Sequence, residues 1–196
     1  MNAMIRKGHT EWASFVEATG ICRCTCYSLF DMHDVVNTLS RDDAVEYGVA
    51  YDHLPDTHGF LLCSFGKDHR RQAFDRRLQH WPFIDCIDGC IFTDYREGWH
   101  RTVDVYREDW MPPTFIGVKG DKGQVVRLLA RPCLLFDDKQ ENIRLVINKG
   151  YMSQGYVVSR GRKTGQVLPQ GARPLNHPSQ WLAASIPIVD QWSPQH

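Results

Sequence analysis

Short apolar runs recur along the chain, separated by segments whose apolar residues follow helical spacing. Five runs with strand-like composition predict strands at 21–31, 59–65, 86–95, 132–138 and 155–159, with a shorter extended piece at 114–118. Helices are predicted at 1–20, 40–50, 67–81, 122–131, 139–150 and 177–192. The segment 96–113 is expected to be a loop or short flap, and 160–174 an exposed loop.

This alternation of strands with helices of about 10 to 15 residues indicates βαβ units and a largely parallel sheet. We therefore expect an α/β fold with about five parallel strands. The whole chain, 1–196, is predicted to be a single domain. It would consist of an N-terminal helix (1–20), a core (21–160) and a C-terminal loop and helix (161–196).

Composition and charge narrow the classes of protein that fit. A hydrophobic content of 42% excludes disorder as the main state. The 23 basic and 23 acidic residues balance, so bulk attraction to DNA or to anionic lipid is not expected. The sequence shows neither a stretch of roughly 20 apolar residues nor a signal-peptide pattern, which predicts a cytoplasmic protein without a membrane partner.

The cysteines and two of the histidines are expected to have structural roles. The chain has seven cysteines, and in a cytoplasmic protein they are expected to be reduced thiols. Cys22, Cys24 and Cys26 would share one face of the first strand and pack in the core, because a zinc site would need a fourth ligand. His53 and His58 are expected in a polar surface turn, with metal binding as the alternative.

Polar residues follow several of the predicted strands directly. Open parallel sheets bind their ligands at the carboxyl ends of the strands, so the residues at these ends are candidates for a site. They are Asp31, Ser64, Asp94, Asp137 and Asp138. One short helix before the strand at 132–138 stands a lysine, either Lys122 or Lys119.

These residue types together suit phosphoryl transfer. Carboxylates that converge at one sheet edge repel each other unless a cation lies between them, and Mg²⁺ prefers such oxygen ligands. Asp31 could then act as a nucleophile that forms an aspartyl-phosphate. A lysine would hold the carboxylate and the phosphoryl oxygens, and the Ser64 hydroxyl would donate a hydrogen bond to one of those oxygens. An ordinary helix-capping role remains the alternative for Asp31 and for the Asp137–Asp138 pair.

The order and spacing of these residues resemble the haloacid dehalogenase (HAD) superfamily. The stretch LFDMHDVVN is similar to the first motif of that family, and KGQVVRLLARPCLLFDDKQENI is similar to its segment from the lysine to the acidic pair. The resemblance implies a Rossmannoid three-layer α/β/α sandwich and a Mg²⁺-dependent phosphatase. It assigns catalytic roles to Asp31, His33, Ser64 and Lys122, and metal binding to Asp31, His33, Asp137 and Asp138.

The first motif departs from the pattern of the family's phosphatases. His33 stands where they carry the Asp that serves as general acid and base, and Asp34 stands where a glycine is usual. A histidine can do proton transfer near neutral pH, which is the role expected for His33. The alternative hypothesis is a catalytically impaired HAD-like domain that binds a phosphorylated ligand or a protein.

The spacing leaves no room for a large cap domain. Ser64 follows Asp31 by 33 positions, and Lys122 follows Ser64 by 58. In the family an uncapped site often goes with macromolecular substrates, so the expected partner is a phosphorylated small molecule or macromolecule. A third, weaker hypothesis is a nucleic-acid end-processing phosphatase, since the helix at 67–81 is basic and Trp99 and Trp110 could stack on bases.

Overall fold

The computed structural model describes residues 12–32, 35–36, 42, 58–65, 87–94, 103–106, 114–149, 154–158 and 172–175. Its strands are β1 (Cys26–Phe30), β2 (His58–Phe65), β3 (Gly89–Asp94), β4 (Val103–Tyr106), β5 (Thr114–Lys119), β6 (Cys133–Asp137), β7 (Gln154–Val158) and β8 (Ala172–Leu175). Its helices include one over residues 12–19, together with α4 (Lys122–Leu129) and α5 (Gln140–Lys149). The predicted helices at 40–50, 67–81 and 177–192 lie outside these residues, apart from the single position Asp42.

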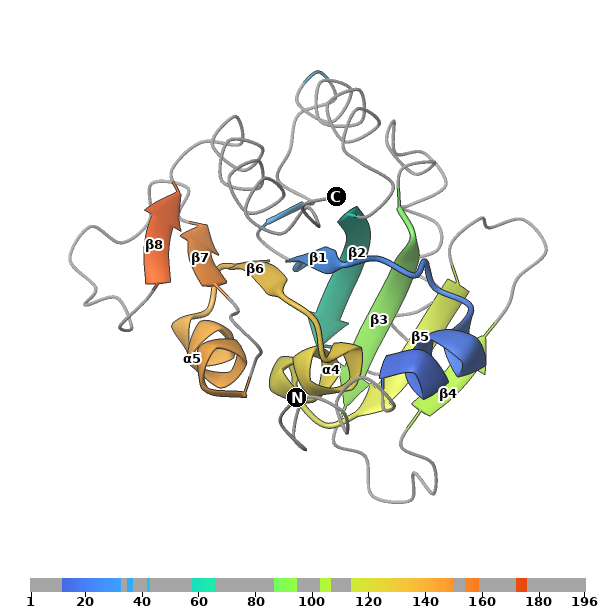
Figure 1. Ribbon diagram of the computed structural model, residues 1–196. Helices are drawn as coiled ribbons and strands as arrows, with labels where there is room; N and C mark the ends of the chain where they lie inside the picture. Colours follow the sequence, from blue (N-terminus) through green and yellow to red (C-terminus); the bar gives the residue numbers. More distant parts are fainter. Residues whose placement is uncertain are drawn as a thin grey trace, which may run out of the picture.

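The described strands form one sheet in the order β4-β5-β3-β2-β1-β6-β7-β8 (Figure 1). Every neighbouring pair is parallel except β4 and β5, which are antiparallel. The fold is therefore α/β with a mainly parallel sheet, as predicted. The sheet has eight strands instead of about five. The expected extended piece at 114–118 is a full strand, β5, while β4 forms within the predicted loop 96–113 and β8 begins within the predicted loop 160–174.

The strand order reverses direction at β1. From β1 the chain places β2 and β3 on one side, and β6, β7 and β8 on the other. Where the order reverses in an open parallel sheet, the adjoining connections leave in opposite directions and open a crevice at the carboxyl ends of the strands. The topology therefore predicts a ligand site at the carboxyl ends of β1 and β6, which are direct neighbours.

The helix over residues 12–19, α4 and α5 cover one face of the sheet (Figure 1). Phe15 and Val16 from the first helix, Val125 and Leu129 from α4, and Ile143 from α5 join the buried core cluster. The same cluster includes alternate side chains of the central strands, which are Tyr27, Leu29, Leu61, Cys63, Ile91, Ile116, Val118, Cys133 and Leu135. Burial of these side chains is the main favourable term that holds the layer in place.

The opposite face of the sheet is also buried. Phe30 stacks on Phe136, with ring centroids 4.4 Å apart, and meets the ring of Phe60 edge-on at 4.8 Å. All five residues of β1 and of β6 are buried. Because both faces are buried, apolar residues predominate on both sides of these strands.

Local signals set the boundaries of the helices. At the start of α4 the side chain of Asp121 accepts a hydrogen bond from the backbone N–H of Gln124 at 2.9 Å, which caps the helix. The helix ends at Ala130, whose φ of 45° is left-handed. The helix over 12–19 ends at Gly20, with φ of 73°, as its glycine predicted.

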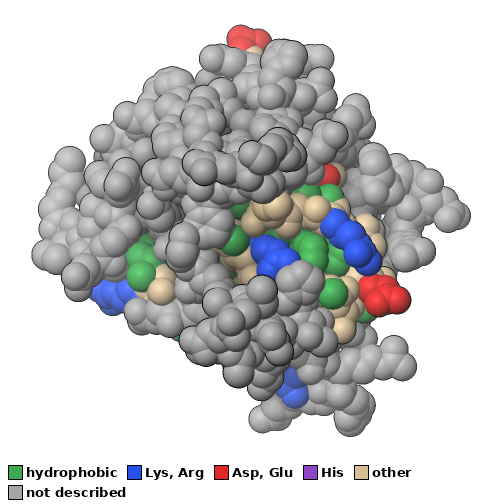
Figure 2. All heavy atoms as spheres, in the orientation of Figure 1, with side chains coloured by type: hydrophobic (Ala, Val, Ile, Leu, Met, Phe, Trp, Pro, Cys, Tyr) green, Lys and Arg blue, Asp and Glu red, His purple; other side chains and the backbone are tan. Residues whose placement is uncertain are grey.

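The surface of the described part mixes charge with apolar area. On the face seen in Figure 2, Lys and Arg side chains reach the surface among hydrophobic side chains. The guanidinium of Arg131 lies over the ring of Trp12, 3.8 Å from its centroid, so a long basic side chain covers an aromatic edge of the core. Among the helices described here, none has the length and apolar character needed to cross a membrane.

Candidate functional site

The register of β1 and β6 brings two carboxylates together. Phe30 of β1 is paired with Phe136 of β6, and the backbone N–H of Asp31 donates to the carbonyl of Phe136 at 2.9 Å. Asp31 and Asp137 come next along these two strands and therefore lie at the same edge of the sheet. Asp31 is 5% exposed and Asp137 is fully buried. The prediction that these distant residues meet at one edge is confirmed.

Lys122 connects the two carboxylates. It is the first residue of α4, and its side chain is 1% exposed. Its Nζ lies 3.0 Å from Oδ1 of Asp31 and 2.5 Å from Oδ2 of Asp137. The alternative lysine, Lys119, ends β5 with an exposed side chain. Of the two candidates, Lys122 is the lysine that contacts the acidic residues.

The charges at this position depend on each other. Burial alone would lower the pKa of Lys122, but Asp137 and Asp31 outweigh burial and raise it above its usual value. Burial raises the pKa of Asp137, against the opposing effect of Lys122. The carboxylate of Asp137 accepts every hydrogen bond it makes with described residues, which favours its ionised form.

Asn142 is a site residue that the sequence analysis missed. It lies in the first turn of α5, and its Nδ2 donates to both oxygens of Asp137, at 3.1 Å to Oδ1 and 2.9 Å to Oδ2. The backbone N–H of Lys139 donates to Oδ1 at 2.8 Å. Asp137 is therefore fixed from the strand side and from the helix side. The signal available in the sequence was an amide side chain in the first turn of the predicted helix, five positions after Asp137.

Asp138 completes a cluster of three carboxylates. One oxygen from each of Asp31, Asp137 and Asp138 lies within 4.8 Å of the others. The opposite ligands of one Mg²⁺ lie roughly 4.2 Å apart, which is twice the metal–oxygen distance. Asp31 and Asp137 share the ammonium of Lys122, so these three groups keep a net negative charge, and Asp138 adds a further carboxylate. The separation of up to 4.8 Å is somewhat wider than this, and it is the all-oxygen donor set that suits a hard divalent cation.

One oxygen of Asp31 is less constrained than the other. Oδ1 accepts from the backbone N–H of Met32 at 2.8 Å and from Lys122. Within the described part of the chain, Oδ2 receives no hydrogen bond. Asp31 therefore has one oxygen that is held in place and a second that can interact with a ligand.

Ser64 and Cys63 differ in their relation to the cluster. Both are buried near the end of β2, and successive strand residues point to opposite faces. Cys63 belongs to the face covered by α4, and its thiol interacts electrostatically with Lys122, Asp31 and Asp137. Burial chiefly raises the pKa of Cys63, to about 12. Ser64 makes no side-chain hydrogen bond to any described residue.

Other candidates are placed as follows. His33 and His53 lie outside the described residues, as do Asp34, Trp99 and Trp110. Asp94 ends β3, at the same edge of the sheet as the cluster.

His58 is not in a surface turn. It begins β2 and is buried, with Nε2 2.7 Å from the Ser28 hydroxyl and Nδ1 3.2 Å from the Cys26 sulfur. Burial lowers the pKa of His58 to about 4. The surface-turn prediction was wrong. Pro55 and Asp56, shortly before His58, are typical of an exposed turn, but partners on β1 satisfy the ring nitrogens of the histidine and allow it to be buried.

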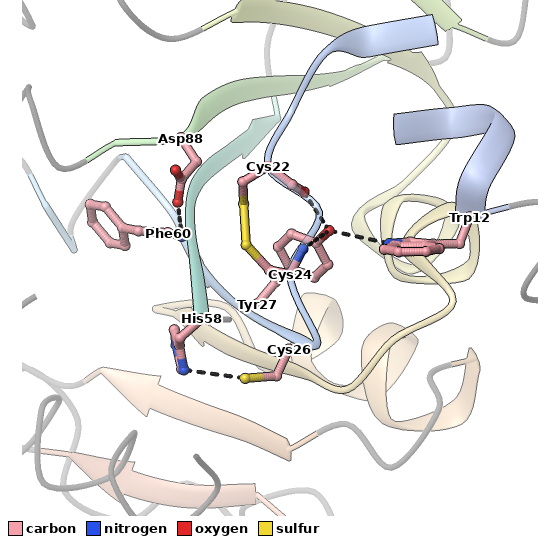
Figure 3. Close-up of a disulfide and its surroundings, with 8 residues drawn as sticks. All are labelled: Trp12, Cys22, Cys24, Cys26, Tyr27, His58, Phe60 and Asp88. Atoms are coloured by element: carbon pink, nitrogen blue, oxygen red, sulfur yellow. Dashed lines mark hydrogen bonds between the residues drawn. A yellow bond between two sulfur atoms is a disulfide. The ribbon is translucent and has the colours of Figure 1, made fainter. Parts of the chain in front are cut away.

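The expectation of three cysteines on one strand face, all reduced, is also corrected. The strand β1 begins only at Cys26, and Cys22 and Cys24 lie before it and form a disulfide (Figure 3). Cys26, Cys63, Cys90 and Cys133 are buried and form no disulfide with another described cysteine. Neither cysteine of the disulfide belongs to the acidic cluster. No family model, curated protein or solved structure matches this chain.

Proposed function

We propose that this chain is a Mg²⁺-dependent phosphatase with a capless, HAD-like Rossmannoid fold, which transfers a phosphoryl group through an aspartyl-phosphate on Asp31. The observation that carries the proposal is the convergence of Asp31, Asp137 and Lys122 where the strand order reverses. Phosphoryl transfer depends on positioning and on charge neutralisation, and this cluster offers groups for both.

Asp31, Asp137 and Asp138 would hold the ion. His33 is predicted both as a ligand and as the proton carrier, and because an imidazolium has no lone pair for a metal, the proposed reaction uses it as the proton carrier. When bound, Mg²⁺ supplies positive charge for the phosphoryl oxygens. The protein's own contribution is to compensate the charge of the carboxylates and to hold them in place. Lys122 does this for Asp31 and Asp137, and Asn142 does it for Asp137.

In the proposed reaction, Oδ2 of Asp31 attacks the phosphorus of a phosphate monoester while Lys122 holds Oδ1. The bond from phosphorus to the leaving oxygen breaks, and that oxygen takes a proton from His33. Water then attacks the phosphorus as His33 accepts a proton from it, which releases inorganic phosphate and restores the carboxylate. The Ser64 hydroxyl is the predicted donor to a phosphoryl oxygen.

The experiment compares hydrolysis of p-nitrophenyl phosphate with and without Mg²⁺. Wild type should turn over only with the ion, and Asp31→Asn should lower kcat/KM by at least about a thousandfold. Asp88→Asn is the matched control, because Asp88 is also a partly buried carboxylate, yet it precedes β3 at the opposite edge of the sheet and accepts from the N–H of Phe60 at 2.7 Å. Full activity in Asp31→Asn would refute the covalent mechanism.

The choice of substrate tests the expected class. An uncapped site predicts higher kcat/KM on a phosphorylated macromolecule than on sugar phosphates. A phosphorylated oligonucleotide and a phosphorylated peptide, each assayed beside a sugar phosphate, separate the nucleic-acid hypothesis from the other macromolecules.

The second candidate is a binding domain without turnover, favoured by His33 and Asp34 in the first motif. It predicts that wild type binds beryllium trifluoride, a phosphoryl mimic, without hydrolysing phosphate esters. Under this alternative, His33→Asp would not raise phosphatase activity and Mg²⁺ would not change the thermal stability, whereas a large gain in activity would indicate a crippled enzyme.

A further inference from the structure

The disulfide between Cys22 and Cys24 lies in the segment that joins the helix over 12–19 to β1 (Figure 3). Its two halves differ in access to solvent. Cys22 is partly exposed, whereas Cys24 is buried, with 2% of its surface accessible. Of the two residues, Cys22 is the one that has surface in contact with solvent, so a thiol in solution would approach the disulfide from the Cys22 side.

This bridge is poorly suited to stabilising the fold. Its two cysteines are only two positions apart in sequence. Closing so short a loop removes little entropy from the unfolded chain, so a bridge of this kind stabilises less than one between distant segments. Other contacts hold this segment in place, so the disulfide can open without unfolding it.

Tyr27 supplies those contacts. Its hydroxyl donates to the carbonyl of Cys22 at 2.9 Å and accepts from the backbone N–H of Cys24 at 3.3 Å (Figure 3). It also accepts from Nε1 of Trp12 at 3.2 Å. Both cysteine backbones are thus held through main-chain atoms, which do not change when the disulfide opens. The two sulfurs stay close enough to rejoin.

The other described cysteines do not compete for the exchange. Cys26, Cys63 and Cys133 are buried, and burial raises the pKa of each thiol, to about 11 for Cys26 and about 12 for Cys63. Only the thiolate is nucleophilic, so these groups react slowly. Among the described cysteines, Cys22 is the one that combines a partner with access to solvent.

We propose that Cys22 and Cys24 form a reversible redox site that exchanges with a dithiol. A thiolate of the dithiol attacks the Cys22 sulfur, the bond between the two cysteines breaks, and Cys24 leaves as a thiolate that takes up a proton. The second thiol of the partner then attacks the mixed disulfide and frees Cys22. Two electrons and two protons pass to the protein, and the dithiol becomes a disulfide. This proposal is independent of the phosphatase.

The test uses dithiothreitol on the folded protein, followed by alkylation and mass spectrometry. Reduction under native conditions should expose two new thiols, at Cys22 and Cys24, and oxidised dithiothreitol should restore the disulfide. A bond that resists reduction until the chain is unfolded in urea would overturn the proposal. Free thiols at both positions under oxidising conditions would overturn it as well.

Two single variants test the direction of attack. With oxidised glutathione, Cys24→Ser leaves Cys22, which should form a mixed disulfide. Cys22→Ser leaves the buried Cys24, which should react at least about tenfold more slowly. Equal rates would contradict the assignment of Cys22 as the attacked sulfur. Circular dichroism of both variants checks that the fold is retained.

Discussion

Nζ of Lys122 lies 2.5 Å from Oδ2 of Asp137, in a position where neither group reaches water. The same ammonium lies 3.0 Å from Asp31, so one buried cation joins β1, β6 and the start of α4. Asp137 follows Lys122 by only 15 positions, whereas Asp31 lies far from both in sequence, and each of the three segments supplies one charge. Loss of the lysine would leave two carboxylates without a cation in a medium that solvates ions poorly.

Replacement of Lys122 by methionine should destabilise the protein strongly. The change keeps the side-chain length but leaves the buried carboxylates of Asp31 and Asp137 without their cation. Breaking one partner of a buried ion pair costs about 3–5 kcal/mol. Urea denaturation at neutral pH measures the loss, and added Mg²⁺ should restore part of it.

Lys119→Met is the matched control for that experiment. Lys119 ends β5 and is exposed, so its replacement should change the free energy of unfolding by less than about 0.5 kcal/mol. A similar loss of unfolding free energy in the two variants would mean that the buried ion pairs of Lys122 do not cause the destabilisation.

Asn142→Ala should weaken both the fold and the proposed metal site. The variant removes the amide that donates to both oxygens of Asp137. Hydrogen bonds to a charged acceptor contribute about 1.5–3 kcal/mol. Because the orientation of Asp137 would relax, the Mg²⁺ affinity measured by thermal shift should fall about 10- to 100-fold. Glu141→Ala, at the exposed neighbouring position, should change neither quantity.

Acid should destabilise the protein through His58. Its pKa is about 4 in the folded chain against a usual 6.5, so between these values the unfolded state binds more protons. Stability therefore falls as the pH drops from 6.5 towards 4, by about 3 kcal/mol from this group.

The free energy of unfolding, measured from pH 7 to pH 4, should show this loss in wild type relative to His58→Asn, which cannot titrate. The difference between the two proteins isolates His58 from the carboxyl groups that both contain. Parallel pH profiles would show that the histidine titrates alike in the folded and unfolded chains.

Gly59→Ala should destabilise the start of β2. A Cβ at this position would lie 2.5 Å from Cδ1 of Tyr27 and 2.8 Å from Sγ of Cys22, closer than van der Waals contact allows. Tyr27 is fully buried and cannot move aside freely. Overpacking of this kind costs about 1–3 kcal/mol, which thermal denaturation can measure. An unchanged Tm would show that Tyr27 and the disulfide segment adjust without cost.

The pattern of apolar runs was sufficient for several elements. It predicted β6, α4 and α5, and the acidic residues at the ends of β1 and β6, although α4 ends earlier than expected, at Leu129. These features depend on neighbours along the chain, since periodicity, caps and glycine stops act over a few residues. The short edge strands β4 and β8 were missed, because an edge strand needs few apolar residues and its pairing partner is distant.

The sequence by itself determined the α/β class and the residues that could form an acidic site. The tertiary structure decided the width of the sheet, the choice of Lys122 over Lys119, and the role of Asn142 at Asp137. It also placed His58 in the core and joined Cys22 to Cys24. The physical reason is that local propensity acts between neighbours in sequence. Burial of charge and pairing of side chains depend instead on which distant segments the strand register brings into contact.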